Sequence, residues 1–470
     1  MRDWMRREPI VITAGKSAVL HDAQGREYLD ANASIWTNLH GHRHPHINAA
    51  IRRQLGKIAH SSALGFANEP ASLLAERLVK VANAKKPRPK KRVSSLSKVF
   101  FSDDGSTAME VALKLACEFA RRSGRSRKPR FLSLTGAYHG DTVGAVSLGH
   151  IDLFRKASDG LIFKSDVVMA PYCYRCPFNR AKPERADARE YRKCNWECVS
   201  KVEQRVAAQR KKGNPYAAMV VEPLMQGAAG MIPQPEGWLR RVAEIVRADG
   251  AQLIADEVMT GFGRTGVGTI ETKAGSRNPK TNSLFACQRE NVEPDYLCLA
   301  KGLTGGYLPM AATLTTQAVF DAFLGEYEEF KTFFHGHSYT GNQLGSAAAL
   351  ASLDLLEKST GIRARRKLEQ TLREELKSLW SLPNVGDVRQ VGLIAGIELV
   401  RDWRTREPFH LRARAGIRVC EAMMRSGVLT RPIGNVLVLM PPYCTTLEQM
   451  RRMVAVMREA IQEVFGARSA

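Results

Sequence analysis

The sequence lacks long apolar runs, a secretory leader and the compositional bias of a fibrous or disordered chain. No stretch of about 18 uncharged apolar residues occurs, which argues against a transmembrane helix. The opening MRDWMRREPIVI is basic but has no adequate apolar core or small-residue cleavage site, so we expect a cytoplasmic protein. With 470 residues, 44% hydrophobic residues and 21 prolines, the chain is long enough for two or three globular domains.

Acidic residues are scarce relative to basic ones. The 47 Asp and Glu against 70 Lys and Arg leave a formal charge of +23. The basic excess is concentrated at residues 85–92, 121–130 and 210–212, in runs that Pro and Gly break or bound, and we expect solvated loops there. Nucleic-acid binding would need a known module or interleaved aromatic residues, and neither is evident. Nucleic acid is therefore not an expected partner.

Three apolar runs end in polar residues that could do chemistry. AAMVVE ends at Glu222, QLIADE reaches Asp256, and DYLCLAK ends at Lys301. Each run is typical of a buried parallel strand, while residues 238–249 have helical periodicity and precede Gly250. Alternating helices and strands predict an α/β sheet, and ligands bind outside the carboxyl ends of the strands in such sheets. The three side chains are therefore expected at one crevice.

Gly105, Ser106 and Thr107 separate a short apolar strand from a segment with helical periodicity. The N–H groups and hydroxyls of such a helix start can bind a phosphate, although these residues could simply cap the helix. Asp256 and Lys301 lie in surroundings where charge is costly. They could form an ion pair with each other. Alternatively, Asp256 could pair with a protonated ring nitrogen of a ligand, and Lys301 could supply a nucleophilic amine. A phosphate anchor, a carboxylate and a reactive lysine together fit pyridoxal 5'-phosphate (PLP).

These residues lie in motifs through which the chain resembles the class III (omega) aminotransferases, PLP enzymes of fold type I. SDDGSTAMEVALKLA, AYHGDT, VVEPLMQGAAGM, LIADEVMTGFGRTG, LAKGLTGG, HGHSYTGN and TRPIGN occur in family order. The resemblance implies an α/β fold with a large PLP-binding domain of mostly parallel sheet over residues 61–345. Residues 1–60 and 346–470 would form a small α+β domain, entered through the helical pattern at 342–358.

The function that the resemblance implies is transamination in biotin biosynthesis. WTNLHGHRHP, YHGDT, HGHSYTGN and RPIGNVLVLMPPY are most similar to the branch that converts 8-amino-7-oxononanoate to 7,8-diaminononanoate. Branches that act on 4-aminobutyrate, ornithine or polyamines stay open. So does a nucleic-acid-binding regulator with a PLP-enzyme fold, which only the charge of +23 motivates. A regulator would not need the catalytic residues, so the presence of Lys301 and Asp256 favours an active enzyme.

The resemblance also assigns roles to individual residues. Lys301 would bond covalently to the cofactor and move protons, Asp256 would hold the pyridine nitrogen protonated, and Tyr138 would stack on the ring; these are the expected catalytic residues. Expected cofactor ligands are Gly105, Ser106, Thr107, Tyr138, Asp256, Lys301, His337 and Ser338. Expected substrate contacts are Trp36, Glu222, Arg264, Gly336 and Arg431, with Arg431 gripping a carboxylate. Packing for Trp36 and Tyr138, and structural ion pairs for Glu222 and Arg264, are the alternatives.

The residues 336–338 match a family segment that reaches the cofactor of the neighbouring subunit. We therefore expect a homodimer with shared active sites that acts on a small amino donor and an oxo-acid acceptor. Ile35 and Val438 stand where relatives that use S-adenosylmethionine carry tryptophan and tyrosine, and a segment that closes the site is missing at the start, which suggests a truncated or misassigned start. Because a sulfonium donor with its adenosine needs aromatic faces, we expect lysine to be the better amino donor.

Two further segments depart from the family pattern. Cys173, Cys176, Cys194 and Cys198 form a CxxC and a CxxxC pair, a spacing that suits a four-thiolate zinc site, unligated loop thiols or redox partners. Residues 267–283 form an insertion with the composition of an exposed loop. The remaining cysteines sit singly in apolar surroundings, as expected for reduced thiols in a core: Cys117, Cys287, Cys298, Cys420 and Cys444.

Overall fold

The structure is a computed structural model that describes residue 5 and residues 8–84, 95–266 and 283–466. The basic run at 85–92 and the insertion at 267–283, except for Ser283, lie outside the described residues. None of the helices in the described ranges is both long enough and apolar enough to cross a membrane.

In the described part of the chain, seven strands form the central sheet, in the order β4-β12-β11-β10-β7-β5-β6. Within this sheet β12 runs opposite to the other strands, so its pairings with β11 and β4 are antiparallel and the remaining pairings are parallel. The expected mostly parallel sheet and its three predicted strands are confirmed. The strands are β4 (Leu96–Ser102), β5 (Phe131–Leu134), β6 (Asp166–Val168), β7 (Ala218–Val221), β10 (Gln252–Asp256), β11 (Tyr296–Leu299) and β12 (Ala311–Thr316).

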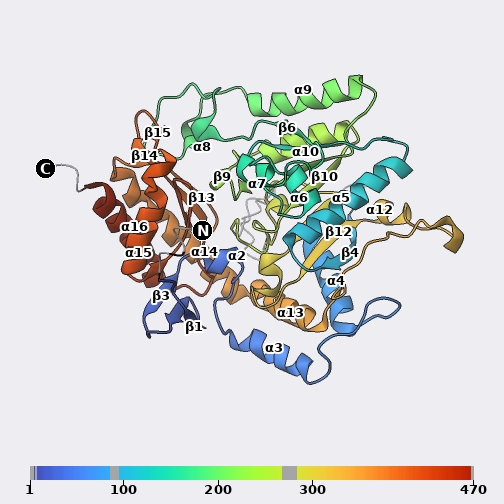
Figure 1. The fold of residues 1–470 in the computed structure, drawn as a ribbon, viewed down its shortest axis with the longest axis horizontal. Coiled ribbons are helices and arrows are strands. Elements are labelled where there is room, and N and C mark those ends of the chain that lie inside the picture. Colours follow the sequence, from blue (N-terminus) through green and yellow to red (C-terminus); the bar gives the residue numbers. More distant parts are fainter. Residues whose placement is uncertain (1–4, 6–7, 85–94, 267–282, 467–470) are drawn as a thin grey trace, which may run out of the picture.

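Helices cover both faces of this sheet (Figure 1). Successive side chains of a strand point to opposite faces, so Val220 joins the apolar cluster on α5 while Val221 joins the cluster on α10. Both faces are buried, and this explains why the strands are apolar without alternation. The helices around this sheet include α4 (Glu69–Ala82), α5 (Gly105–Arg122), α6 (Val143–Leu148), α7 (Asp152–Ala157), α9 (Glu197–Lys211), α10 (Trp238–Ala248), α12 (Gln317–Asp321) and α13 (Gln343–Glu357).

The two helix predictions are correct, but two of the basic runs expected as loops begin inside helices, because Arg121 and Arg122 end α5 and Arg210 and Lys211 end α9. The helix expected at 238–249 is α10, and Gly250 follows it with φ of 77°. The helix expected at 342–358 is α13, capped by Asn342. The run at 210–212 is not a loop, because α9 continues to Lys211. Basic side chains are favourable in the last turn of a helix, where the dipole is negative, and this accounts for the correction.

The first strands pair with the end of the chain. β1 (Ile12–Lys16), β2 (Val19–Asp22) and β3 (Glu27–Asp30) form an antiparallel sheet, and β16 (Val428–Leu429) adds in parallel to β3. Figure 1 shows these blue strands beside the red C-terminal helices. In contrast, α3 (Pro45–Leu55) packs on α13. The division into domains at 60 and 345 stays a prediction.

A further sheet near the C-terminus has the order β13-β14-β18-β17, with β15 paired to β14. Its strands and helices enclose a separate apolar cluster that includes Leu372, Ile397 and Met453. The elements are β13 (Val385–Val391), β14 (Ile394–Asp402), β15 (Glu407–Pro408), β17 (Pro432–Ile433), β18 (Val436–Leu439), α14 (Ser359–Leu376), α15 (Ala415–Arg425) and α16 (Leu447–Gly466).

Candidate active site

A cavity of about 460 Å³ lies at the carboxyl ends of the parallel strands. The segments that follow β4, β5, β7, β10 and β11 each contribute to its wall, and Trp36 and Thr37 line it from the N-terminal part. This is where an open α/β sheet binds its ligand. Glu222, Asp256 and Lys301 all line the cavity, so the prediction that three strands point their chemistry at one crevice is confirmed.

Lys301 follows β11 and begins the short 3-10 turn η2 (Lys301–Thr304) with a φ of 37°. Burial lowers the pKa of its amine, and the nearby carboxylates of Asp256 and Glu222 partly oppose this effect. Its Nζ lies 5.4 Å from the centre of the Trp36 ring. Within the described ranges Lys301 has no ion-pair partner, so the alternative of a Lys301–Asp256 pair does not describe this structure. A desolvated amine without an ion-pair partner is suited to nucleophilic attack on a carbonyl carbon.

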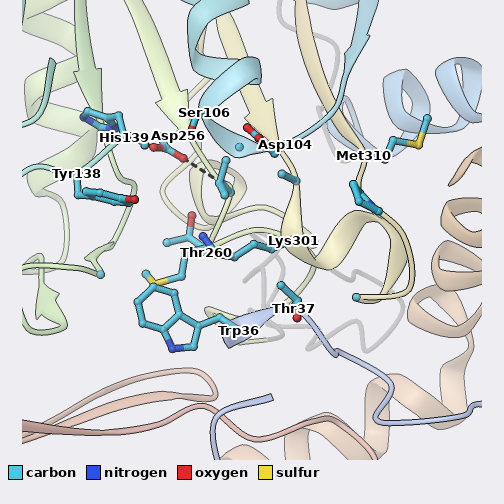
Figure 2. Close-up of a pocket in the computed structure, with 18 of the residues that line it drawn as sticks. Trp36, Thr37, Asp104, Ser106, Tyr138, His139, Asp256, Thr260, Lys301 and Met310 are labelled. Atoms are coloured by element: carbon cyan, nitrogen blue, oxygen red, sulfur yellow. Dashed lines mark hydrogen bonds and ion pairs between the residues drawn. The ribbon is translucent and has the colours of Figure 1, made fainter. Parts of the chain in front are cut away.

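Asp256 ends β10, and its carboxylate is held from two sides. His139 Nδ1 lies 2.7 Å from Asp256 Oδ2, and the backbone N–H of Val258 donates to Oδ1 at 3.1 Å. Both Asp256 and His139 are buried, and Figure 2 shows them side by side at the cavity. His139 escapes prediction from the sequence because its partner is 117 positions away; its place next to Tyr138 is the one local signal.

Tyr138 and Glu222 are joined through the backbone. The N–H groups of Tyr138 and Gly227 donate to the Glu222 carboxylate at 3.2 and 2.8 Å. Burial raises the pKa of Glu222 to about 7, despite these hydrogen bonds. The Tyr138 hydroxyl donates to Asp141 at 2.8 Å, and its ring faces the cavity from the end of β5 (Figure 2).

The start of α5 forms a cradle of small residues. Asp104, not the Gly-Ser-Thr run, caps this helix, in a capping box with Thr107. Gly105 and Ser106 line the cavity, whereas Thr107 is not among its lining residues. A Cβ on Gly105 would lie 2.7 Å from a Val258 methyl group, and one on Gly140, whose φ is 126°, would lie 2.2 Å from Ser106 Oγ. The side chains of Val258 and Ser106 therefore leave no room for a Cβ at these two positions, and the positive φ of Gly140 also favours glycine.

These residues fit PLP. The N-terminus of α5 and the Ser106 hydroxyl suit its phosphate, and Asp256 suits a protonated ring nitrogen. The Lys301 amine lies in the same cavity, and the buried hydroxyl of Thr260 has no hydrogen-bond partner among the described residues. The cavity thus offers each group that this cofactor needs.

Comparison with known proteins places the chain in a family. The model of the class III aminotransferases matches residues 2–461. The chain belongs to this family. It is a PLP-dependent aminotransferase of fold type I, as the motifs indicate. A relative from Geobacter sulfurreducens, named adenosylmethionine-8-amino-7-oxononanoate aminotransferase, is 46% identical over 99% of this chain and 95% of its own. A relative of the same name from Aquifex aeolicus is 40% identical over 99% of this chain and 94% of its own.

Solved structures agree with this assignment. The enzyme of that name from Methanocaldococcus jannaschii superposes with a TM-score of 0.84 at 38% identity, covering 98% of this chain and 95% of the other. An amine transaminase from an uncultivated Pseudomonas species, solved in PLP-bound form, superposes with a TM-score of 0.83 at 32% identity, over 98% and 96% of the two chains.

Other residues predicted for this class III aminotransferase lie away from the cavity. Arg264 is buried, its Nη1 donates to the Pro441 carbonyl at 2.5 Å, and its guanidinium lies over the Tyr443 ring. Arg431 is exposed, and so are Gly336 and Ser338, while His337 Nδ1 lies 3.0 Å from Asp103 Oδ2. None of these residues lines the cavity, so their roles as ligands stay predictions.

The zinc prediction for the aminotransferase is not supported by the side-chain arrangement. Over the described ranges, no three His, Cys, Asp or Glu side chains are grouped so that they could hold a metal ion. All nine cysteines are free thiols. The four predicted zinc ligands are therefore not assembled as a metal centre in this structure.

Proposed function

We propose that the enzyme transfers an amino group to 8-amino-7-oxononanoate and so makes 7,8-diaminononanoate for biotin biosynthesis. The observation that carries this proposal is the combination of a complete set of cofactor-binding side chains at one cavity with relatives of that name at 40–46% identity over nearly the whole chain. Free cysteines are typical of a reducing compartment, so the cytoplasm is the proposed location.

Each side chain at the cavity has a role in this reaction. PLP, when bound, supplies an electron sink for the negative charge that develops on the substrate carbon. Lys301 would hold the cofactor and would move a proton at Nζ, because its desolvated amine is a nucleophile and a base. Asp256 keeps the ring nitrogen protonated, and His139 orients the carboxylate. Tyr138 would stack on the cofactor ring, and Gly105 and Ser106 would hold its phosphate, since all three line the cavity.

We infer that substrate recognition uses Trp36 at the cavity together with Arg431, which does not line it. Trp36 lines the cavity, and its indole N–H donates to Asn32 at 2.9 Å, which fixes the ring. The exposed Arg431 is the proposed partner of the ketone's carboxylate, because a guanidinium binds a carboxylate with two parallel hydrogen bonds. The buried Glu222 and Arg264 shape the surroundings rather than bind the carboxylate directly.

The amino donor we propose is S-adenosylmethionine, as in the names of the relatives. The expectation of lysine rests on Ile35 and Val438, and neither lines the cavity. Ile35 is 49% exposed, and Val438 is buried in an apolar cluster against which Trp36 packs. The lysine hypothesis therefore loses the structural argument on which it depends, and remains an outcome of the donor assay.

The test compares purified enzyme on a series of oxo-acceptors and on the two donors. We expect kcat/KM for 8-amino-7-oxononanoate to exceed that for succinic semialdehyde and other ω-oxo acids by at least about tenfold, or about 1.4 kcal/mol. With the ketone fixed, S-adenosylmethionine should exceed lysine by a similar factor. A preference for an ω-oxo acid would assign the enzyme to another branch of the class III aminotransferases. A preference for lysine would confirm the donor that the sequence predicts.

A further inference from the structure

A second cavity, of about 610 Å³, lies at the opposite edge of the central sheet from the active site. The segments before β5, β6 and β7 form part of its wall, and one face of α5 forms most of the rest. These three strands run parallel, so the cavity lies at their amino ends, whereas the active-site cavity lies at the carboxyl ends. The two cavities share no lining residue. The volume is in the range of about 300–1,000 Å³ that small-molecule sites occupy.

Basic side chains dominate the wall of this cavity. Among the described residues that line it, Glu118 alone is acidic and five are basic. The basic residues are Lys114, Arg121, Lys128, Arg130 and Lys164. Arg121 donates to Glu118 at 2.7 Å, and Arg130 Nη2 donates to Asp166 at 2.8 Å. Carboxylates therefore balance two of the five basic side chains.

Three lysines remain without a carboxylate partner in the described part of the chain. Lys128 and Lys164 are exposed and form no ion pair there. Lys114 Nζ lies 2.9 Å from His335 Nδ1, a ring nitrogen that carries no negative charge. Three ammonium groups at one cavity create a positive potential, which favours an anion with more than one charge.

The backbone that carries the two exposed lysines is fixed by hydrogen bonds. Asn214 donates from Nδ2 to the Lys128 carbonyl at 3.2 Å and accepts at Oδ1 from the Ser126 hydroxyl at 2.6 Å. The N–H of Phe163, which precedes Lys164, donates to the Ser147 hydroxyl at 3.0 Å. The wall is thus formed before any ligand binds, and only the flexible ends of the lysines need to be ordered.

An aromatic ring lies next to these charges. Phe163 lines the cavity with 39% of its surface exposed. Its ring centre lies 6.3 Å from that of Phe131, which is buried and supports it from the sheet side. Leu113 and Pro129 add apolar surface to the same wall. An exposed ring that is held in place from behind offers a face on which a planar ligand can stack.

We propose that this cavity binds a phosphorylated aromatic anion of the nucleotide class. Lysine ammonium groups bind phosphate oxygens as point charges, and a chain of phosphates carries several negative charges for the three lysines. The Phe163 ring would stack on the base. A simple carboxylate has one charge and no ring, so it would use neither feature fully. The proposal goes beyond the transamination and does not depend on which ketone the enzyme aminates.

The experiment is calorimetric titration of the PLP-loaded holoenzyme at low ionic strength, where exposed charges are least screened. Bound PLP keeps the phosphate cradle of the active site occupied. The probes are ATP, tripolyphosphate, which lacks the ring, and adenosine, which lacks the phosphates. We expect ATP to bind at least about tenfold more tightly than either partial probe, because only ATP contacts both the lysines and the ring.

Substitutions locate the binding on the molecule. Lys128→Glu and Lys164→Glu should each weaken ATP and tripolyphosphate at least about tenfold. Phe163→Ala should weaken ATP about tenfold and leave tripolyphosphate unchanged. The matched controls should bind ATP as wild type does: Lys80→Glu changes an exposed lysine on α4, which packs on the other face of the sheet, and Phe320→Ala changes a phenylalanine that is also 39% exposed. Melting temperature and PLP absorbance verify that each variant is folded.

The absence of measurable ATP binding to the wild-type holoenzyme would overturn the proposal. Equal ATP affinity in wild type, Lys128→Glu and Lys164→Glu would do the same, because the nucleotide would then bind elsewhere. Adenosine or tripolyphosphate that binds as tightly as ATP would also contradict it, as would a DNA duplex that binds more tightly than ATP and loses affinity in the same variants. None of these results bears on the acceptor and donor assays, so each proposal can fail alone.

Discussion

His139 is the residue whose role the structure adds to the site. Its ring contacts Asp256 at 2.7 Å in a buried environment, where a hydrogen bond to a charged group stabilises by about 1.5–3 kcal/mol. We expect Asp256→Asn to lower kcat by at least about a hundredfold. His139→Ala should lower it about tenfold and weaken cofactor binding. His139→Asn, whose amide can donate, should recover part of both.

Two measurements distinguish a positioning role of His139 from simple packing. They are the dissociation constant of the cofactor and kcat, each determined at several pH values for every His139 variant. A packing role would lower the melting temperature of all His139 variants equally and leave cofactor affinity unchanged. Asp256→Asn with near-normal turnover would remove this carboxylate from its assigned role.

We expect Glu222 to make the stability of the enzyme depend on pH. Burial raises its pKa to about 7, above an ordinary value of 4.5. The folded chain therefore holds this proton more tightly than the unfolded chain, and a stabilisation that is complete below about pH 4.5 is lost as the pH rises through about 7. The loss amounts to about 3 kcal/mol. In Glu222→Gln the side chain is neutral at every pH, so this part of the decline should disappear.

The measurement is the free energy of unfolding in urea between pH 5 and 8, with cofactor removed from both proteins. Some decline should remain in Glu222→Gln, because burial also raises the pKa of Glu257 to about 7. Identical pH profiles for wild type and variant would contradict the assignment.

At the scale of elements, the start of α5 depends on one capping residue. Asp104 accepts from the Thr107 N–H at 2.9 Å, and Ser106 lies in the turn between them. Asp104→Ala should destabilise the enzyme by about 1 kcal/mol and weaken cofactor binding roughly fivefold, because the cradle loses its cap. Asp104→Asn keeps the acceptor and should behave as wild type. Calorimetry measures the change in stability, and cofactor titration measures the change in affinity. An unchanged cofactor affinity in Asp104→Ala would show that the helix cap does not contribute to cofactor binding.

The sequence predicts an element where burial imposes an apolar pattern on it. It does not predict a feature that depends on contacts between residues that are far apart in the chain. β7, β10 and β11 are apolar on both faces, so their ends at Glu222, Asp256 and Lys301 could be located. The composition of the basic run at 210–212 predicts a loop, yet the run ends α9, because polarity alone does not distinguish a helix end from a turn. His139 and the cap at Asp104 carry no periodic signal, since both depend on contacts that only the folded chain supplies.

At the scale of the whole molecule, part of the predicted site lies on an exposed surface. Phe334 is 67% exposed and Tyr339 is 64% exposed, on either side of residues 336–338. Exposed apolar side chains of this kind are typical of an interface between subunits. We propose that this surface meets a second copy of the chain, so that Ser338 and its neighbours complete the partner's site. The family motifs predict these residues, but a single chain cannot show where they act.

This proposal predicts a homodimer that one substitution can weaken. Phe334→Asp places a charge in the interface and should shift sedimentation from dimer to monomer, with loss of cofactor and turnover. Leu411→Asp, at a residue that is 80% exposed in the C-terminal part, is the matched control and should remain dimeric. A wild-type enzyme that is fully active as a monomer would refute the shared site.

The most direct test of the account locates the cofactor on the chain. Borohydride reduces the bond between PLP and its lysine to a stable amine, and peptide mass spectrometry then identifies the labelled residue. The account predicts the label on Lys301 in wild type, none in Lys301→Ala, and the wild-type result in Lys80→Ala, which alters an exposed lysine on α4. Lys301→Ala should also lose at least about a thousandfold in turnover, because the amine is both nucleophile and base. A label on another lysine, or full turnover without Lys301, would contradict the account.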